Sequence, residues 1–150
     1  NCIIFTQSFI GYKLFLFFYK NWFIFIANNL FFSFMNKRKI TKLNNLNFEP
    51  FNKYGEPIKG WQWHKISFDE KTNFGTYVSK LDPGTKTIPH IHTGNEEFLI
   101  LDGELIDSDG TIFKKGDFIS YEPNTKHSSY TKKGCLILTF MRGHNNQIKE

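Results

Sequence analysis

Cysteine is scarce in this sequence, and no two cysteines have the spacing of a zinc or redox motif. Cys2 and Cys135 lie at opposite ends of the 150 residues. This arrangement argues against a disulfide framework or a zinc ribbon, so a reducing, cytoplasmic compartment is the simpler expectation. Because Cys135 begins the apolar run Cys135-Leu136-Ile137-Leu138, we expect it to be buried as a small hydrophobic residue.

Acidic residues are absent from residues 1–34, which are rich in Phe, Ile, Leu, Asn and Tyr. The longest uncharged run, Asn21 to Met35, is interrupted by Asn28 and Asn29, and it is too short and too polar for a typical membrane-spanning helix. The usual order of a signal peptide is also missing. Three interpretations stay open: a membrane anchor, a cryptic signal, or sequence translated upstream of the true start. We favour the third, because Met35 begins a hydrophilic stretch typical of a protein start.

Positive charge is not organised for nucleic-acid binding, although the formal net charge is +5. The densest basic cluster, within residues 37–42, lies in a polar stretch rich in Asn, and beyond it lysines and acidic residues are interspersed. Charge alone specifies no element that reads a nucleic-acid groove. We therefore predict no nucleic-acid partner and no membrane association, a flexible polar stretch over residues 35–47, and one domain over residues 48–150.

Helical periodicity of useful length is absent after residue 48, where turn signals recur at short intervals instead. The runs between the turns are rich in aromatic and β-branched residues, at 74–81, 96–101, 118–121 and 136–140. Short strands at this spacing predict an all-β sandwich or barrel. The turn signals lie at Asp82-Pro83-Gly84, Thr93-Gly94-Asn95, Asp102-Gly103, Asp109-Gly110, Lys115-Gly116-Asp117, Pro123-Asn124 and Lys133-Gly134.

Potential metal ligands gather around His90 and His92. Residues two apart on a strand point to the same face, so both imidazoles are expected to converge on one point. After the three-residue turn at 93–95, an antiparallel return would bring Glu96 beside the pair, and His127 begins a later strand. Three imidazole nitrogens and one carboxylate suit zinc, iron(II), manganese, nickel or copper.

The spacing of these residues resembles both motifs of the cupin superfamily. The first motif is a glycine, five residues, His-x-His, three residues, Glu, six residues and a glycine; the second joins a glycine to a histidine across ten residues. The resemblance implies a single small jelly-roll β-barrel that binds one divalent metal ion through His90, His92, Glu96 and His127. The matching positions are Gly84, His90, His92, Glu96 and Gly103 for the first motif, and Gly116 and His127 for the second.

The second motif departs from the family pattern at three places. Pro123 is displaced by one residue, and Asn124 or Thr125 stands where a glycine is usual. Asn tolerates positive φ, so the turn stays feasible. Thr131 stands where an asparagine often follows the histidine. The contact that this asparagine makes outside the ligand shell is therefore not expected in the same form.

Glu97 is an alternative carboxylate ligand, because the first motif also tolerates a four-residue spacing. Glu96 is preferred, since it alone keeps the six-residue interval to Gly103. Strand alternation places Glu96 and Phe98 on one face and Glu97 on the other.

Within the superfamily, residues 83–143 are similar to the ChrR-like cupin domains. The cues are Pro-Gly, then His-x-His with Gly-x-Glu-Glu, and His127-Ser128-Ser129 leading to Gly134-Cys135. In the anti-sigma relatives, a separate N-terminal zinc-binding helical domain holds the sigma factor. Residues 1–63 contain no histidine and only Cys2, so we do not expect an anti-sigma factor of that design.

The resemblance implies two kinds of function for the metal site. Three neutral histidines and one carboxylate leave a divalent ion with a net charge of about +1. A six-coordinate iron(II) would keep two open positions, which suits a non-haem dioxygenase acting on a diketone-like or related oxygenated compound. A four-coordinate zinc would close the shell and serve a sensor or binding module, or only hold strands together. We expect a small-molecule ligand or substrate, and pairing of edge strands into a homodimer.

Other candidates near the motif have weaker support. Glu97, Glu104 and Tyr121 are general-base candidates only by proximity along the chain, and structural roles are expected for them. His64 and His144 have no motif partner, so they are expected on the surface or in the core. Apolar lining for a cavity is available from Trp61, Trp63, Phe98, Ile100 and Met141.

Overall fold

A computed structural model of the protein describes residues 19–22, 24, 26 and 38–148. The chain divides into two units, Asn1–Ile40 and Thr41–Glu150. In the first unit the described residues 19–22, 24 and 26 are helical and exposed. None of the described helical residues forms a helix long and apolar enough to cross a membrane. The domain boundaries at 34 and 47 and the interpretations of residues 1–34 remain predictions, because residues 1–18, 23, 25 and 27–37 lie outside the described part.

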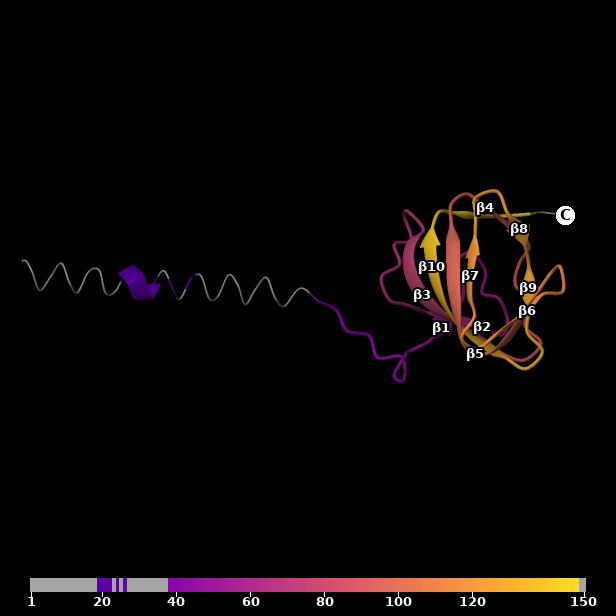
Figure 1. Ribbon diagram of the computed structural model, residues 1–150, viewed down its shortest axis with the longest axis horizontal. Coiled ribbons are helices and arrows are strands. Elements are labelled where there is room, and N and C mark those ends of the chain that lie inside the picture. Colours follow the sequence, from indigo (N-terminus) through magenta and orange to yellow (C-terminus); the bar gives the residue numbers. More distant parts are fainter. Residues whose placement is uncertain (1–18, 23, 25, 27–37, 149–150) are drawn as a thin grey trace, which may run out of the picture. The chain divides into compact units, whose positions relative to one another are not determined.

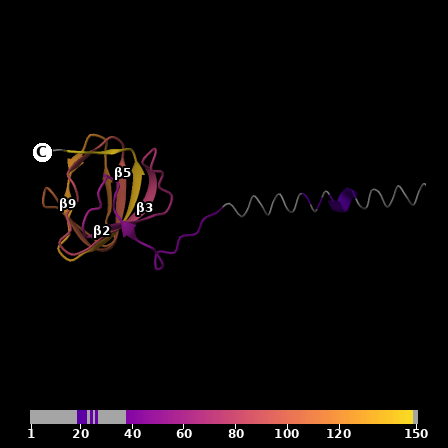
Figure 2. The same ribbon diagram turned by 180° about the vertical axis from the view of Figure 1, so that it is seen from behind.

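Antiparallel strands build the second unit into a barrel, seen from two sides in Figures 1 and 2. One sheet has eight strands in the order β1-β2-β3-β10-β5-β6, with β7 and β9 also paired to β5; a second sheet has the order β11-β4-β8. The predicted all-β fold, a single small jelly-roll β-barrel, is confirmed. The strands are β1 (Glu49–Pro50), β2 (Trp61–Lys65), β3 (Phe74–Leu81), β4 (His90–His92), β5 (Glu96–Asp107), β6 (Ile112–Lys114), β7 (Phe118–Tyr121), β8 (Lys126–His127), β9 (Ser129–Tyr130), β10 (Cys135–Arg142) and β11 (Asn145–Gln147).

Two of the predicted strands coincide with observed ones, and one predicted turn is wrong. The runs at 74–81 and 118–121 are β3 and β7, and the run at 136–140 lies inside β10. The Asp102-Gly103 turn does not occur, because β5 continues from Glu96 to Asp107. Instead β5 bends there: its first half pairs with β10 and β7, and its second half pairs with β6 and β9.

Gly103 makes this bend possible. Its φ is +79°, a left-handed value that side chains other than glycine disfavour. A Cβ atom at Gly103 would lie 2.2 Å from the carbonyl oxygen of Gly134. The backbone at Gly134, just before β10, therefore lies so close to β5 that only glycine fits at position 103. The bend lets β5 contribute to both ends of the barrel.

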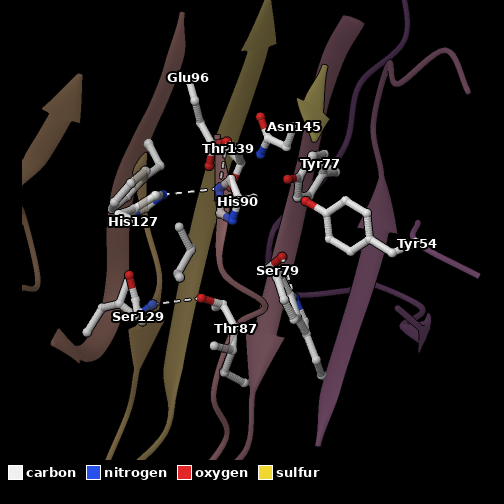
Figure 3. A pocket seen from close by; sticks show the side chains of 15 residues that line it. Tyr54, Tyr77, Ser79, Thr87, His90, Glu96, His127, Ser129, Thr139 and Asn145 are labelled. Atoms are coloured by element: carbon white, nitrogen blue, oxygen red, sulfur yellow. Dashed lines mark hydrogen bonds and ion pairs between the residues drawn. The ribbon is translucent and has the colours of Figure 1, made fainter. Parts of the chain in front are cut away.

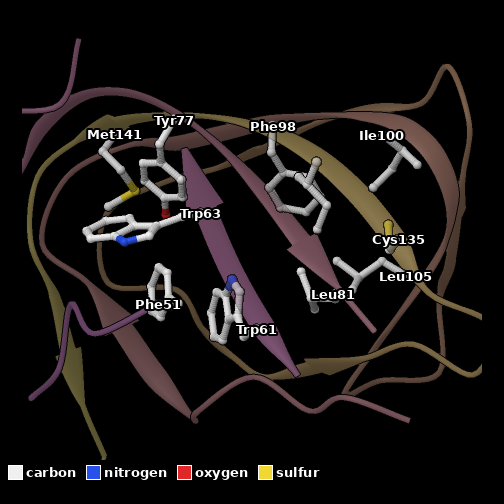
Figure 4. Close-up of a cluster of buried hydrophobic side chains, with 11 residues drawn as sticks. Phe51, Trp61, Trp63, Tyr77, Leu81, Phe98, Ile100, Leu105, Cys135 and Met141 are labelled. Carbon is white, nitrogen blue, oxygen red and sulfur yellow. The ribbon is translucent and has the colours of Figure 1, made fainter. Parts of the chain in front are cut away.

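Aromatic side chains dominate the core beneath β2 and β3 (Figure 4). Phe51 stacks on Trp61 with ring centroids 3.9 Å apart and an interplanar angle of 3°, and its edge meets Trp63 at 4.8 Å. Such pairs add about 0.5–1.5 kcal/mol each beyond their area burial. Cys135 is a buried free thiol, as predicted, and burial raises its pKa to about 12. The rest of the core cluster comprises Tyr77, Leu81, Phe98, Ile100, Leu105, Ile137 and Met141.

Candidate metal centre

Strands β4 and β8 place three imidazoles beside one another. His90 and His92 flank Ile91 on β4, and both histidines are buried while Ile91 is half-buried. β8 pairs antiparallel with β4 so that His127 lies directly opposite His90. The ring centroids of His127 lie 4.6 Å from those of His90 and 4.9 Å from those of His92. The predicted convergence of the three imidazoles is therefore observed.

Glu96 reaches the same point from the other sheet. The turn at residues 93–95 is observed, but the simple antiparallel return expected from the sequence is not. β4 pairs with β11 and β8, whereas β5 pairs with β10, β7, β6 and β9. Gly94 permits this crossing between sheets, because a Cβ atom there would lie 2.2 Å from the carbonyl oxygen of Arg142. The four candidate ligands thus come from two sheets.

The distances between the four side chains suit a single metal ion. His127 Nε2 lies 3.2 Å from His90 Nε2, and Glu96 Oε2 lies 3.4 Å from His92 Nε2 and 3.9 Å from His90 Nε2. Ligand atoms about 2.1 Å from a shared ion are about 3.4 Å apart in a tetrahedral shell. In an octahedral shell they are about 3.0 Å apart when adjacent and about 4.2 Å apart when opposite. The cluster of His90, His92, Glu96 and His127, with ligand atoms all within 4.8 Å of one another, could hold one metal ion.

Hydrogen bonds on the far side of two imidazoles fix their orientation. His90 Nδ1 donates to the carbonyl oxygen of Ile88 at 2.7 Å, and His92 Nδ1 pairs with Thr125 Oγ1 at 2.9 Å. Because the Thr125 hydroxyl itself donates to the carbonyl oxygen of Glu122, its oxygen accepts from His92. Both histidines are therefore protonated at Nδ1, and their Nε2 lone pairs face the cluster.

Asp107, the last residue of β5, holds the third imidazole and was missed by the sequence analysis. Its carboxylate accepts hydrogen bonds from His127 Nδ1 at 3.1 Å, from the Tyr121 hydroxyl at 2.5 Å and from Ser129 Oγ at 3.2 Å. Burial alone would raise the pKa of Asp107, but the hydrogen bonds from His127 and Tyr121 outweigh it and lower the pKa to about 2. A fixed negative charge behind His127 keeps Nδ1 protonated and directs Nε2 to the cluster. In the sequence Asp107 looks like an ordinary residue before a turn.

The facing lone pairs are the strongest sign that the cluster is built for a cation. His90 Nε2 and His127 Nε2 face each other at 3.2 Å although the Nδ1 atom of each is engaged elsewhere. His92 Nε2 is buried and has no hydrogen-bond partner among the described residues. Unpaired buried acceptors are costly, and one positive ion would satisfy all of them together. The donor set therefore fits the metal that the resemblance implies.

The protonation states at neutral pH also match metal ligands. Burial lowers the pKa of His90 and lowers the pKa of His92 to about 4, although the Glu96 carboxylate opposes the shift. Burial would raise the pKa of Glu96, but its attraction to His90 and His92 and a hydrogen bond from Asn145 hold it below the usual value. Neutral imidazoles beside an ionised carboxylate are the forms that bind metal ions.

The alternative ligand and the other histidines lie elsewhere. Glu97 is on the opposite face of β5, where its carboxylate meets Arg142 Nη2 at 3.1 Å. His64 Nδ1 contacts the backbone oxygen of Asn47, and His144 contacts the side chain of Asn73. The preference for Glu96 over Glu97 thus agrees with the geometry, and neither remaining histidine joins the cluster.

The departures in the second motif have structural explanations. Asn124 adopts a φ of +70°, so the turn forms without the usual glycine. Thr125 supplies the acceptor for His92. Thr131 closes a turn by accepting a hydrogen bond from the backbone N–H of Gly134. Asn145 of β11 contributes an outer contact instead, since its Nδ2 donates to Glu96 Oε2; no motif pointed to it.

A small cavity of about 40 Å³ adjoins the cluster inside the barrel (Figure 3). Three of the four candidate ligands, His90, Glu96 and His127, line it. A cavity of this volume holds about three water molecules. Of the predicted apolar lining residues, Trp61 and Phe98 face the cavity, whereas the other three pack in the core. The remaining lining comprises Tyr54, Tyr77, Ser79, Leu81, Thr87, Leu105, Ser129, Ile137, Thr139 and Asn145.

None of the three general-base candidates, Glu97, Glu104 and Tyr121, lines this cavity. Glu97 faces outward, and Glu104 is half-buried opposite Lys114 of β6. Burial and the neighbouring Asp107 raise the pKa of Tyr121 well above its ordinary value. Tyr121 is therefore a hydrogen-bond donor, and the expectation of structural roles agrees with these contacts.

Comparisons with known proteins agree with the fold and the site. The sequence profile of the ChrR Cupin-like domain family matches residues 36–145. A comparison with curated protein sequences finds no match.

Three solved structures illustrate the similarity in fold. An RmlC-like cupin protein from Ralstonia eutropha JMP134 has a TM-score of 0.64 at 13% identity, over 76% of this chain and 74% of its own. An acetylacetone dioxygenase from Acinetobacter johnsonii has a TM-score of 0.63 at 18% identity, over 77% and 80%. A chain of the complex between SigE and the anti-sigma ChrR from Rhodobacter sphaeroides has a TM-score of 0.50 at 17% identity, over 65% and 49%.

Proposed function

The chain belongs to the ChrR cupin-like domain family, and we propose that it is a metal-dependent dioxygenase acting on a small diketone-like compound. In this proposal His90, His92, Glu96 and His127 bind one divalent ion, with iron(II) as the active metal. The observation that carries the proposal is the position of the cluster at the wall of an interior cavity. Because His90, Glu96 and His127 line that cavity, a bound ion has room beside it for a ligand that the protein does not supply.

The cavity lining suits a small oxygenated compound. Burial raises the pKa of Tyr54 and of Tyr77 far above the ordinary value, with a further contribution from Glu96. Both hydroxyls therefore stay protonated and can donate hydrogen bonds to a ligand oxygen. The side chains of Phe98 and Leu105 supply an apolar wall, which limits access of water.

The charges of the site favour an anionic ligand. The three imidazoles are neutral, so the one carboxylate offsets a single positive charge of a divalent ion. The enolate of a β-diketone would offset the second. A bound iron(II) would supply a positive centre for the enolate oxygens and the electrons that activate dioxygen. In such a reaction one dioxygen is consumed per diketone, both oxygen atoms end in the products, and no external reductant is needed.

The size of the cavity restricts the substrate. About 40 Å³ leaves room for the chelating end of a compound and little more without movement of side chains. We therefore expect activity on short diketones such as acetylacetone, and a steep loss of activity as the carbon chain lengthens.

The test uses the full chain, loaded with iron(II) under anaerobic conditions and mixed with acetylacetone. We expect a visible absorption band, its decay on admission of oxygen, and uptake of one dioxygen per diketone. The matched controls are His90→Ala, which removes a candidate ligand, and His144→Ala, which removes an exposed imidazole outside the cluster. Iron-loaded protein that gives no band and no oxygen uptake across a panel of diketones would refute the dioxygenase proposal.

A zinc-binding sensor or binding module is the second candidate. It is favoured by the number of candidate ligands, since His90, His92, Glu96 and His127 suffice to close the shell of a four-coordinate zinc. The two candidates differ in the metal recovered with the protein and in turnover. Stoichiometric zinc in protein purified without added metal, together with no oxygen uptake after iron loading, would support the sensor.

A further inference from the structure

The cavity beside the metal cluster extends along the strands, away from the candidate ligands. On β10, Met141 lies opposite Glu96, whereas Ile137 comes four residues earlier and lies further from the cluster. On β3, Tyr77 and Leu81 are likewise four residues apart, which separates their backbones by about 13 Å. The cavity is lined by Glu96 and Tyr77 at one end and by Ile137 and Leu81 at the other. Its long direction therefore follows β3 and β10.

The polarity of the lining changes along this direction. The cluster end carries the carboxylate of Glu96 and the hydroxyl of Tyr77. The other end, here called the apolar end, is formed by the buried side chains of Leu81, Leu105 and Ile137. Figure 4 shows Leu81 and Leu105 together, at the opposite end of the core from Tyr77. A ligand with one oxygenated end and one hydrocarbon end would therefore bury its apolar surface in one orientation only.

The polar side chains between the two ends already have partners within the protein. Ser79 Oγ accepts a hydrogen bond from Trp61 Nε1 at 3.0 Å. Thr87 Oγ1 accepts one from the backbone N–H of Ser129 at 2.7 Å, and Ser129 Oγ donates to Asp107 at 3.2 Å. Figure 3 shows Ser79, Thr87 and Ser129 on the side of the cavity away from Glu96. The middle of the cavity therefore does not call for a second polar group on the ligand.

We propose that the ligand of this cavity carries a hydrocarbon tail that points away from the cluster, and that the apolar end determines the longest tail that fits. The inference rests on the proposed function, in which the oxygenated end of a diketone-like compound binds at the cluster. A cavity of about 40 Å³ is filled by that oxygenated end and a short tail, so a longer tail must displace Leu81, Leu105 or Ile137. Close-packed core side chains resist such displacement. Tail length is thus selected by residues remote from the metal.

The test measures binding of two diketones and does not depend on turnover. The full chain is loaded with iron(II) under anaerobic conditions, and the visible absorption band reports the bound diketone. The dissociation constant of acetylacetone is compared with that of its butyl homologue, in which a butyl group replaces one terminal methyl group. The wild type should bind the butyl homologue at least about tenfold more weakly, since one methylene group in an apolar pocket can change binding by that factor.

Variants at the apolar end should change this preference. Leu105→Ala enlarges the apolar end, and an apolar cavity left by such a truncation can bind a small apolar group. It should bind the butyl homologue at least about tenfold more tightly than the wild type does, while its affinity for acetylacetone stays unchanged. Ile137→Val disturbs the packing less, and it should shift the preference in the same direction by a smaller factor.

The matched control is Leu99→Ala, which truncates a leucine of the same strand as Leu105. Leu99 alternates with the buried Phe98 and Ile100, so it points away from the barrel interior, and it does not line the cavity. This variant should keep the preference of the wild type.

Several results would overturn the proposal. They are equal binding of the two diketones by the wild type, no binding of either, no gain for the butyl homologue in both Leu105→Ala and Ile137→Val, or an equal gain in Leu99→Ala. Oxygen uptake tests the proposed function separately. A protein that binds the diketones with the expected pattern and consumes no oxygen would refute the dioxygenase reaction and support the assignment of the tail.

Discussion

Replacing Asp107 with asparagine tests how far a carboxylate outside the metal cluster determines metal affinity. Asp107 accepts hydrogen bonds from His127, Tyr121 and Ser129, and from the backbone N–H of Ser108. Asparagine keeps the shape and one acceptor oxygen but removes the negative charge behind His127. Loss of such an outer partner typically costs about 10–100-fold in metal affinity, or roughly 1.4–2.7 kcal/mol. In the absence of metal, the free energy of unfolding of Asp107→Asn should be about 1–3 kcal/mol lower than that of the wild type.

The assay is a competition titration of zinc between the protein and a chromogenic chelator. The matched control is Asp109→Asn, which removes the same charge from an exposed residue whose carboxylate accepts from the backbone N–H of Thr111. We expect Asp109→Asn to change affinity by no more than about twofold, because salt screens an exposed charge. A wild-type affinity in Asp107→Asn, or equal losses in both variants, would refute the role assigned to Asp107.

Four further predictions concern the candidate ligands, the N-terminal residues and the dependence of stability on pH. Metal occupancy, measured by elemental analysis, should fall sharply in His90→Ala, His92→Ala and His127→Ala and stay unchanged in His64→Ala and His144→Ala. Glu96→Gln should weaken zinc binding far more than Glu97→Gln, since the two side chains lie on opposite faces of β5; the reverse order would contradict the assignment. A chain starting at Met35 should fold and carry metal, and its precipitation, with membrane insertion of the full chain, would favour the anchor interpretation. Because the pKa of Asp107 falls from 3.8 to about 2 on folding, its stabilising contribution should be complete above about pH 4 and lost as pH falls towards 2, as thermal melts of wild type and Asp107→Asn can show.

The local pattern of the sequence predicted the strands and the convergence of His90 and His92 well; metal binding by the cluster stays a prediction. Turn residues bracket β3 and β7, and strand alternation brings His90 and His92 to one face, because both effects act within a few residues. The Asp102-Gly103 turn was wrong for a related reason: glycine signals a left-handed backbone, but the same signal serves a reversal of the chain or a bend within one strand. Packing of β10 against β5 decides between these outcomes.

Contacts between distant segments could not be predicted in the same way. Asp107 accepts a hydrogen bond from His127, which lies 20 positions later in the sequence, and Asn145 donates one to Glu96, which lies 49 positions earlier. Neither Asp107 nor Asn145 belongs to a motif. Lys53 looks like one more surface lysine in the sequence, and only the fold reveals that its ammonium is buried. The assignment of β4 and β5 to different sheets was missed because a three-residue turn is equally compatible with a hairpin.

The division of the cluster between two sheets bears on how long the protein survives when metal is scarce. The small sheet contains strands of three, three and two residues, which are too short to be stable on their own. A metal ion bound across the cluster would tie this sheet to β5, and chelation would therefore raise the frequency of local opening there more than in β3 or β10. Amide hydrogen exchange after chelation would be fastest at β4, β8 and β11. In a cell, proteases act on such opened segments, so metal supply would control the turnover of the chain as well as its chemistry.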